Sequence, residues 1–197
     1  YNLPYYSNSA EAIRGFHDLG EVWISIGKKI GRGDLIKEGE NLVRESEELK
    51  KDMYVSIERS LLNNLHPSHL PGVAGAKKPY DKIEDEWEGE VINFRCYSEM
   101  FHSGCLSRNM VETIVQYQSQ HGGRLLGIPG GRGRMAGFIS YGYAYGLLQH
   151  DLIREFLLFY YSHMAHNYTR GTWTATEFGN ADRSKPSAPY CAPAQLT

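Results

Sequence analysis

The first part of the chain carries apolar and glycine residues at helical spacing. The stripe consists of Ile13, Phe16, Gly20, Trp23, Gly27 and Ile30. Asn8, followed three residues later by Glu11, resembles a capping box, and the glycine at position 31 is typical of a helix end. We therefore predict a first helix between Asn8 and Gly31. The two glycines within its stripe would let a neighbouring helix approach closely.

A second helix is predicted from about Leu35 to about Leu62, with Asp34 available to cap it. Its apolar face carries Leu35, Leu42, Leu49, Met53 and Ile57. Its opposite face carries Lys37, Glu38, Glu40, Arg44, Glu45, Glu47, Glu48, Lys50 and Lys51. This amphipathic pattern is typical of an outer helix with one face in solvent.

Residues 63–93 break the helical pattern and form the longest predicted loop. Three prolines and three glycines interrupt this stretch, and an acidic run covers 84–90. Loops of this length are usually functional or disordered. We interpret the acidic run as a solvated surface, and a cation site is the alternative.

Helical spacing returns in the second half of the chain. It predicts helices over 97–102, 107–120, 141–149 and about 151–168. The last of these is apolar on nearly all sides, so we predict that it is buried. Residues 170–197 form a proline- and serine-rich tail without helical spacing. The sequence therefore predicts a single all-α domain of paired antiparallel helices with long irregular loops.

Length and charge narrow the classes of function. The 197 residues fit one domain, and 41% hydrophobic residues permit a core. The formal net charge of −2 gives no basic surface for nucleic acid or for a membrane. No apolar run reaches the roughly 18 residues of a membrane helix. Three widely spaced cysteines indicate neither a disulfide framework nor a zinc site, and buried free thiols are expected for Cys96 and Cys105.

The chain begins with Tyr1 rather than Met and shows no signal peptide. We expect a processed product or a piece of a longer protein, with the remainder of that chain as a partner. The sequence leaves the compartment open, and a secreted or periplasmic location is favoured.

Aromatic residues gather with His, Arg and carboxylates in the segments that join the later helices. Tyrosine occurs 14 times, and its hydroxyl suits a half-wet position. Rings that pack on sugar faces, beside charged groups that bind hydroxyls, are typical of helical proteins that bind carbohydrate. An oligo- or polysaccharide is therefore the predicted partner.

Four segments resemble the (α/α)6 toroid, the barrel of paired helices used by many glycoside hydrolases and polysaccharide lyases. They are Tyr97–Met100, Gly142–Gly146, Leu148–Asp151 and Arg170–Trp173. The resemblance implies a carbohydrate-active enzyme. Because six helix pairs need more residues than this chain has, it also implies a partial barrel.

Glu177 is the predicted general acid. Trp173, in the same segment, would desolvate its carboxyl group and keep it protonated near neutral pH. Glu99 or Asp18 is the predicted second carboxylate that a glycosidase needs. The alternative for Glu99 is a structural pair with His102, which follows three residues later in the same predicted helix.

Six residues are predicted to bind the substrate. They are Trp173, Arg170, His102, Tyr141, Tyr145 and His17. The alternative for the tyrosines is core packing, and the alternative for His17 is a helix-stabilising pair with Glu21. We predict no metal and no cofactor, because the ligand spacings that either would need do not occur.

Three functions agree with these residues. The favoured hypothesis is hydrolysis of glycosidic bonds by carboxylate acid/base chemistry. The second is a polysaccharide lyase that uses Tyr, His and Arg side chains. Tyr141, Tyr143 or Tyr145 would remove the proton, and Arg124, Arg132 or Arg170 would neutralise the uronate carboxylate. The third is a noncatalytic helical module that binds a glycan or a protein.

Overall fold

The computed structural model describes residues 3–131, 133–166 and 178–180, and these are predominantly helical. The α-helices are α1 (Tyr6–Ile30), α2 (Gly33–Ser60), α3 (Glu86–Val91), α4 (Tyr97–His102), α5 (Arg108–Gln120), α6 (Ser140–Gln149) and α7 (Ile153–His166). Shorter turns are η1 (Tyr80–Lys82), η2 (Ile92–Cys96) and η3 (Gly137–Ile139), and η2 is a π-helix. Two short antiparallel pairs join β1 (Arg124–Leu125) to β2 (Ile128–Pro129) and β3 (Arg134–Ala136) to β4 (Phe178–Asn180). The predicted helical class is confirmed in this coarse form.

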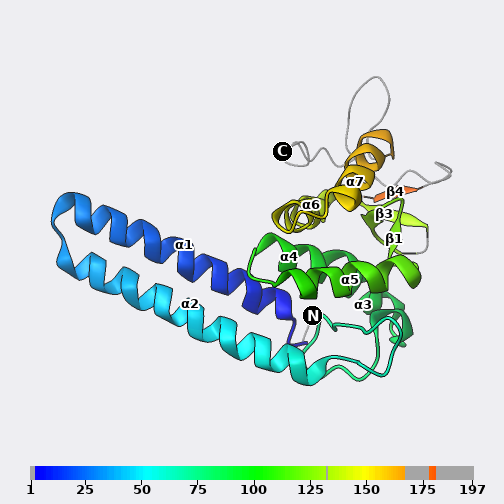
Figure 1. The fold of residues 1–197 in the computed structure, drawn as a ribbon, viewed down its shortest axis with the longest axis horizontal. Coiled ribbons are helices and arrows are strands. Elements are labelled where there is room, and N and C mark those ends of the chain that lie inside the picture. Colours follow the sequence, from blue (N-terminus) through cyan, green and yellow to red (C-terminus); the bar gives the residue numbers. More distant parts are fainter. Residues whose placement is uncertain (1–2, 132, 167–177, 181–197) are drawn as a thin grey trace.

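Helices α1 and α2 form an antiparallel hairpin, here called the arm, that projects from the rest of the molecule (Figure 1). The two helices approach closely at a pair of glycines. A Cβ at Gly20 would lie 2.7 Å from the carbonyl oxygen of Gly39, and a Cβ at Gly39 would lie 2.5 Å from that of Gly20. Gly31 ends α1 in the left-handed conformation, with a φ of 71°. The predicted helix end and the close approach at Gly20 are therefore confirmed.

The predicted caps of the two arm helices are wrong. Helix α1 begins before Asn8, and the side chain of Glu11 contacts His102 instead of closing a capping box. Helix α2 begins before Asp34, which lies in the first turn and pairs with Arg32. An acidic side chain there still stabilises the helix, because it lies near the positive end of the helix dipole.

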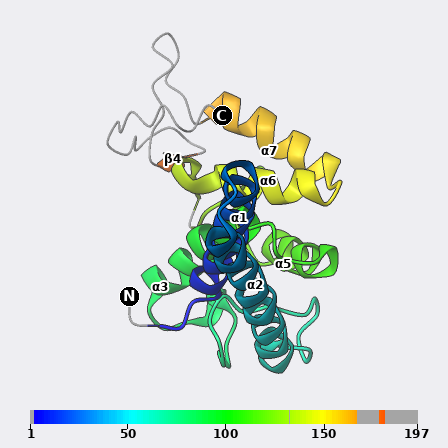
Figure 2. The same cartoon turned by 90° about the vertical axis from the view of Figure 1, so that its left-hand side faces the viewer.

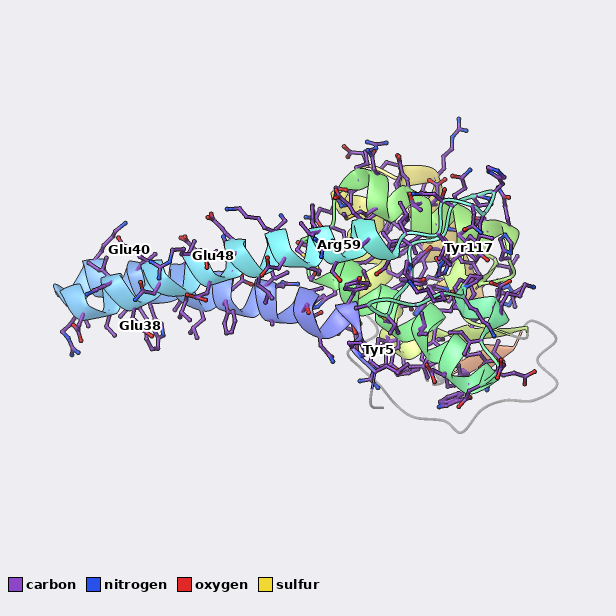
Figure 3. All side chains as sticks on the ribbon, turned by 90° about the horizontal axis from the view of Figure 1, so that it is seen from below. Tyr5, Glu38, Glu40, Glu48, Arg59 and Tyr117 are labelled. Atoms are coloured by element: carbon purple, nitrogen blue, oxygen red, sulfur yellow. The ribbon has the colours of Figure 1, made fainter. Side chains whose placement is uncertain are left out.

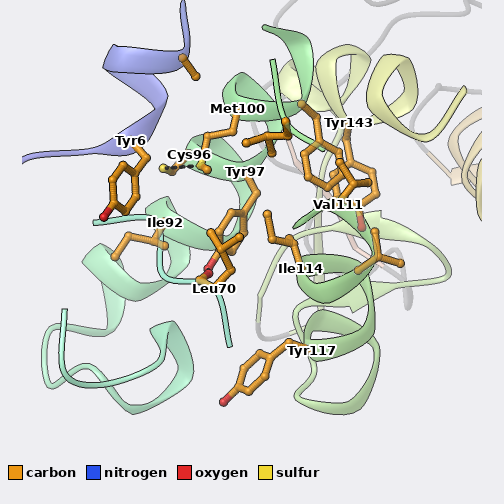
Figure 4. Packing of buried hydrophobic residues seen from close by; sticks show 14 of the residues in the cluster. Tyr6, Leu70, Ile92, Cys96, Tyr97, Met100, Val111, Ile114, Tyr117 and Tyr143 are labelled. Atoms are coloured by element: carbon orange, nitrogen blue, oxygen red, sulfur yellow. Dashed lines mark hydrogen bonds between the residues drawn. The ribbon is translucent and has the colours of Figure 1, made fainter. Parts of the chain in front are cut away.

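The part of the molecule outside the arm is here called the body. The hydrophobic core lies there, around α4. Figure 4 shows Tyr97 of α4 between Ile92 on one side and Ile114 of α5 on the other. Tyr97, Met100 and Phe101 are fully buried, and their α4 packs closely against α6. The core thereby connects the N-terminal half of the chain to the helices that follow.

Cys96 and Cys105 are buried free thiols, as expected. Burial raises the pKa of Cys96 to about 12, and its thiol donates to the carbonyl oxygen of Gly72 at 3.2 Å. A thiol held in its neutral form reacts slowly, so this residue fills the core rather than carrying chemistry.

Two segments differ from their predictions. The predicted loop 63–93 contains η1 and α3, because Asp85 caps α3 by accepting hydrogen bonds from the amides of Trp87 and Glu88. Helix α7 is not buried on all sides: in the described part of the chain it packs on α6 and β2, and six of its apolar residues stay exposed. Its exposed side carries Ile153, Leu157, Leu158, Tyr160, Tyr161 and Met164. The predicted tail 170–197 lies outside the described residues except for 178–180.

Figure 2, which looks along the arm, shows α6 and α7 on one side of the body and α3 and α5 on opposite flanks. Within the described part of the chain, no helix combines the length and the apolar character needed to cross a bilayer. The loops around α3 and the end of α5 lie at the end of the body that is far from the tip of the arm (Figure 1).

Candidate functional site

Several residues predicted from the sequence meet where α1, α4 and α6 adjoin. Nδ1 of His102 lies 2.9 Å from Oε1 of Glu11, and Nη1 of Arg14 donates to the carbonyl oxygen of His102 at 2.6 Å. The rings of Tyr141 and Tyr145 lie edge-on to the His102 ring, with centroids 5.1 and 6.2 Å away. Both tyrosines are exposed rather than packed in the core. This group forms an open aromatic surface.

His17 and Asp18 lie near this surface on α1, and both are exposed. Asp18 accepts a hydrogen bond from Nε of Arg14 at 3.3 Å, and its other oxygen lies 3.2 Å from Nδ1 of His17. The bond to His17 and the charge of Arg14 lower the pKa of Asp18. The second carboxylate of a glycosidase must be ionised, as Asp18 is, but Asp18 lies on the exposed surface in a pair with Arg14 and His17.

Glu99 lies apart from Asp18. Its carboxylate pairs with Nε of Arg95 at 2.8 Å and lines a cleft of about 170 Å³ with Tyr5 and Asn8. Among the described residues that line this cleft, Glu99 is the one carboxylate. The structure therefore does not bring the two predicted second carboxylates together. Glu99 also pairs with Arg95 and not with His102, which was its structural alternative.

The remaining predicted residues lie outside the described part of the chain. They are Glu177, Trp173 and Arg170, together with Arg132 of the lyase alternative. Arg124, the other arginine of that alternative, is described, and its Nη2 donates to the hydroxyl of Ser119.

A second cleft, which the sequence did not predict, gathers ionisable groups from three parts of the chain. It has a volume of about 270 Å³ and is here called the acidic cleft. Its lining comes from η1, from α3 and η2, and from the glycine-rich loops after α5. The lining residues are Tyr80, Asp81, Ile83, Glu86, Gly89, Glu90, Asn93, His121, Gly122, Gly130 and Gly131.

Asp81 is the best-anchored carboxylate of the acidic cleft, with a side chain that is 15% exposed. The hydroxyl of Tyr117 donates to its Oδ1 at 2.8 Å, and Nζ of Lys82 lies 3.4 Å from Oδ2. Burial alone would raise the pKa of Asp81, but the hydrogen bonds from Tyr117 and Lys82 outweigh it, and the pKa lies below its ordinary value. Asp81 is therefore ionised at neutral pH.

His121 connects Asp81 to the open part of the cleft. Its Nδ1 lies 3.4 Å from Oδ2 of Asp81, and its ring stacks on the ring of Tyr117 at a centroid distance of 3.9 Å. The His121 side chain remains 30% exposed. The nearby carboxylate and the stacked ring together restrict the orientation of His121, and a histidine that transfers protons needs such a fixed orientation.

Asn93 fixes the glycine-rich loops on the other side of the cleft. Its Nδ2 donates to the carbonyl oxygens of Gly123 and Gly130 at 2.8 and 2.5 Å. Its Oδ1 accepts from Nε2 of Gln118 at 2.8 Å, and Oε1 of Gln118 accepts from the hydroxyl of Tyr143 at 2.7 Å. This buried network couples the loops to α5 and α6, so the wall of the cleft is held in place before any ligand binds.

Glu90 supplies a further carboxylate that is 10% exposed. It forms an ion pair with Arg134, and the guanidinium of Arg134 lies over the ring of Phe178, 5.1 Å from its centroid. The β3–β4 pair therefore contacts the acidic cleft through Arg134.

Tyr80 and His69 lie behind the cleft. The Tyr80 hydroxyl is buried and makes no hydrogen bond to any residue that the structure describes. A Cβ at Gly123 would lie 2.2 Å from it, so only glycine fits there. Tyr80 also lines a larger, mostly apolar cavity of about 410 Å³ on its other side, together with His69. The wall between the two cavities is therefore thin.

The acidic cleft is suited to acid/base chemistry on a polar ligand. Asp81, Glu86 and Glu90 supply carboxylates, and His121 supplies an oriented imidazole. Across the described residues, no three His, Cys, Asp or Glu side chains are arranged to hold a metal ion. A signal in the sequence could have revealed part of this cleft. Glu86, Glu90 and Asn93 recur at helical spacing inside the run that we interpreted as solvated surface.

Comparison of the chain with protein-family models, with curated proteins and with solved structures finds no match.

Proposed function

We propose that this protein is a carbohydrate-active enzyme that hydrolyses a neutral glycan in the acidic cleft. The observation that carries the proposal is the convergence of an anchored Asp81–His121 pair and a second carboxylate, Glu90, on one cleft. His121 gives a proton to the glycosidic oxygen as the bond from that oxygen to the anomeric carbon breaks. Water then adds to this carbon and returns a proton to His121, and Asp81 orients the His121 ring. Glu90 stabilises the positive charge that develops on the sugar ring.

The charge of the cleft favours hydrolysis over elimination. A lyase acts on a uronate and needs cations at the carboxylate of its substrate. Three carboxylates line the acidic cleft, and its described lining includes no lysine or arginine. The nearby cations Lys82 and Arg134 are already paired with two of these carboxylates, so the cleft does not attract a uronate. A neutral sugar needs no such attraction, and its hydroxyls can donate to the carboxylate oxygens.

The resemblance to an (α/α)6 toroid remains part of the proposal. The exposed apolar side of α7 supports it, because a further helix pair would cover such a side in a complete barrel. We propose that the remainder of the same chain supplies that pair.

A noncatalytic glycan-binding role is the second candidate, and it rests on the open aromatic surface of Tyr141, Tyr145 and His102. Exposed rings beside Arg14 and Glu11 offer stacking and hydrogen bonding to a sugar without a cleft. In this case the rings bind the glycan and no glycosidic bond is cleaved.

A panel of neutral and uronic-acid polysaccharides tests these functions. Hydrolysis releases reducing ends without a new ultraviolet absorbance, and elimination adds the absorbance of an unsaturated uronate. Binding alone retards the protein in a gel that contains the glycan and releases neither product. We expect reducing ends from a neutral polysaccharide, and their loss in His121→Gln. Product formation that survives this substitution would remove the acidic cleft from the proposal.

A further inference from the structure

The arm carries an apolar face that the rest of the described structure leaves in solvent. On α1 it consists of Phe16, Leu19, Trp23, Ile26 and Ile30, at alternating spacings of three and four residues. Four of these side chains are 40 to 59% exposed, and Trp23 is partly buried. This spacing is that of the contact seam of a coiled coil. Figure 3 shows the arm with its side chains clear of the body.

Helix α2 contributes to the same side of the arm. The close approach of the two helices at Gly20, Gly27 and Gly39 is here called the glycine seam. Its contacts place Ile24, Ile36 and Val43 together on one side of the hairpin. Trp23, Leu35 and Leu42 each precede one of these residues, and one step along a helix turns the side chain by about 100°. They therefore lie on the opposite side, where Leu49 continues the row at the same seven-residue interval. The three leucines are half-buried, and Leu49 also packs against the core. The apolar face thus spans both helices and is here called the seat.

The border of this seat on α2 is acidic. Glu38, Glu45 and Asp52 each follow a leucine of the seat by three residues, so they lie along its edge, and all three are exposed. Figure 3 labels Glu38 on the outer part of the arm. Lys37, Arg44 and Lys51 begin one step further round the helix, and Nη2 of Arg44 reaches Oε1 of Glu45 at 3.9 Å across the exposed surface. A single exposed pair of this kind is weak and leaves the row acidic overall.

The border on α1 carries no matching row of basic residues. It holds Asp18 towards the body and Lys29 towards the tip. Residues at such edge positions select the partner of a coiled coil by charge. A second copy of this chain would bring an identical acidic row to the contact, and like charges at an interface oppose association.

We propose that the apolar face of the arm binds an amphipathic helix whose apolar stripe is flanked by lysine or arginine. The seat from Leu35 to Asp52 covers about 26 Å of helix, so a partner helix of roughly 18 residues matches its length. The apolar stripe of the partner packs against both arm helices, and its basic flank pairs with Glu38, Glu45 and Asp52. This role is independent of the acidic cleft.

The test uses the full chain and two synthetic peptides. Both peptides have 21 residues with leucine at the seam positions; one carries lysine at the flanks and the other glutamate. Fluorescence anisotropy measures the dissociation constant of each. We expect the lysine peptide to bind at least tenfold more tightly than the glutamate peptide, and to weaken as salt is raised. Equal binding, or binding of neither peptide, overturns the proposal.

Matched variants locate the contact. The double variant Glu38→Lys with Glu45→Lys should raise the dissociation constant of the lysine peptide at least tenfold. Glu40→Lys with Glu47→Lys makes the same charge change on the other face of α2 and should alter binding less than twofold. Equal losses of affinity for the lysine peptide in the two double variants would show only a general effect of charge and would overturn the proposal.

Sedimentation of the chain without peptide tests whether a second copy of the chain occupies the apolar face. A monomer supports the proposal. A dimer that the lysine peptide fails to dissociate would assign the face to a second copy instead.

Discussion

Nδ1 of His121 lies 3.4 Å from Oδ2 of Asp81, while the hydroxyl of Tyr117 donates to Oδ1 of the same carboxylate at 2.8 Å. The His121 and Tyr117 rings are also stacked and nearly parallel, with an interplanar angle of 1°. Asp81 therefore joins two rings that already touch. The tyrosine fixes the carboxylate, and the carboxylate fixes the imidazole.

Asp81→Asn is expected to lower turnover of the neutral glycan about a hundredfold, because His121 would lose the carboxylate that orients it and with it most of its acid/base contribution. The amide oxygen can still accept from Tyr117, so the fold is retained, but it cannot stabilise a protonated His121. The measurement is the rate of reducing-end release at saturating glycan. Asp34→Asn, which removes an exposed carboxylate paired with Arg32 at the tip of the arm, is the control and should retain full rate. An unchanged rate in Asp81→Asn would contradict the assigned role.

The helices could be predicted from the sequence because their apolar spacing is local. The end of α1 at Gly31 and the close approach at Gly20 follow from residue type alone. Asn8 and Glu11 show the limit of this reasoning. Their spacing fits a capping box, but a tertiary contact with His102 places Glu11 elsewhere.

The acidic cleft could not be predicted because its parts are far apart in the sequence. Asp81 and His121 lie 40 positions apart, and nothing local to either indicates the other. The candidate residues of the open aromatic surface were found by type, and the structure brings Tyr141, Tyr145 and His102 together. Their exposure could not be predicted, because an apolar stripe does not reveal which neighbour covers it.

His69 makes the protein sensitive to acid. Burial lowers the pKa of His69 to about 4, the charge of Asp81 opposes this shift, and His121 adds to it. The hydroxyl of Tyr97 donates to the carbonyl oxygen of Leu70, so Nε2 of His69, 3.1 Å from the Tyr97 oxygen, carries the ring hydrogen. Nδ1 makes no hydrogen bond within the described residues, and no described carboxylate bonds to it. The folded state therefore holds this ring neutral.

The unfolded state binds a proton at this histidine below its ordinary pKa of 6.5, and the folded state does so only near pH 4. The contribution of neutral His69 to the free energy of unfolding is thus complete above about pH 6.5. It falls by roughly 3 kcal/mol as the pH falls towards 4. Urea unfolding at several pH values measures it. His69→Phe keeps a ring beside Tyr117 and should flatten this part of the profile, while the exposed His17→Gln should leave it unchanged. A profile of His69→Phe as steep as that of the parent would refute the explanation.

The glycine seam of the arm predicts opposite effects for the same substitution at two positions of α1. A Cβ at Gly20 meets the backbone of Gly39, which cannot move aside, so Gly20→Ala should destabilise the protein by about 1–3 kcal/mol. A Cβ at Gly15 meets nothing within 4 Å among the described residues, so Gly15→Ala should stabilise α1 by about 0.5–1 kcal/mol. Thermal unfolding followed by circular dichroism compares the two. Equal midpoints would mean that the helices do not approach as closely as the structure shows.

Tyr143 belongs to the network that holds the glycine-rich loops. It is fully buried, and its hydroxyl donates to Oε1 of Gln118, whose amide nitrogen bonds Asn93. Tyr143→Phe deprives a buried acceptor of this donor, and such losses cost about 1–3 kcal/mol. Tyr145→Phe is the matched control, because the Tyr145 side chain is exposed and no such network depends on it in the described structure.

The substitution should also loosen the wall of the acidic cleft, because Asn93 would no longer be fixed by a rigid Gln118. The amide of Gly123 donates to the carbonyl oxygen of Gln118 at 3.0 Å and reports on this directly. We expect faster hydrogen exchange at Gly123 in Tyr143→Phe than in Tyr145→Phe, together with slower reducing-end release. Loss of stability without faster exchange at Gly123 would mean that Tyr143 supports the core alone, and that the loops are held by Asn93 independently of it.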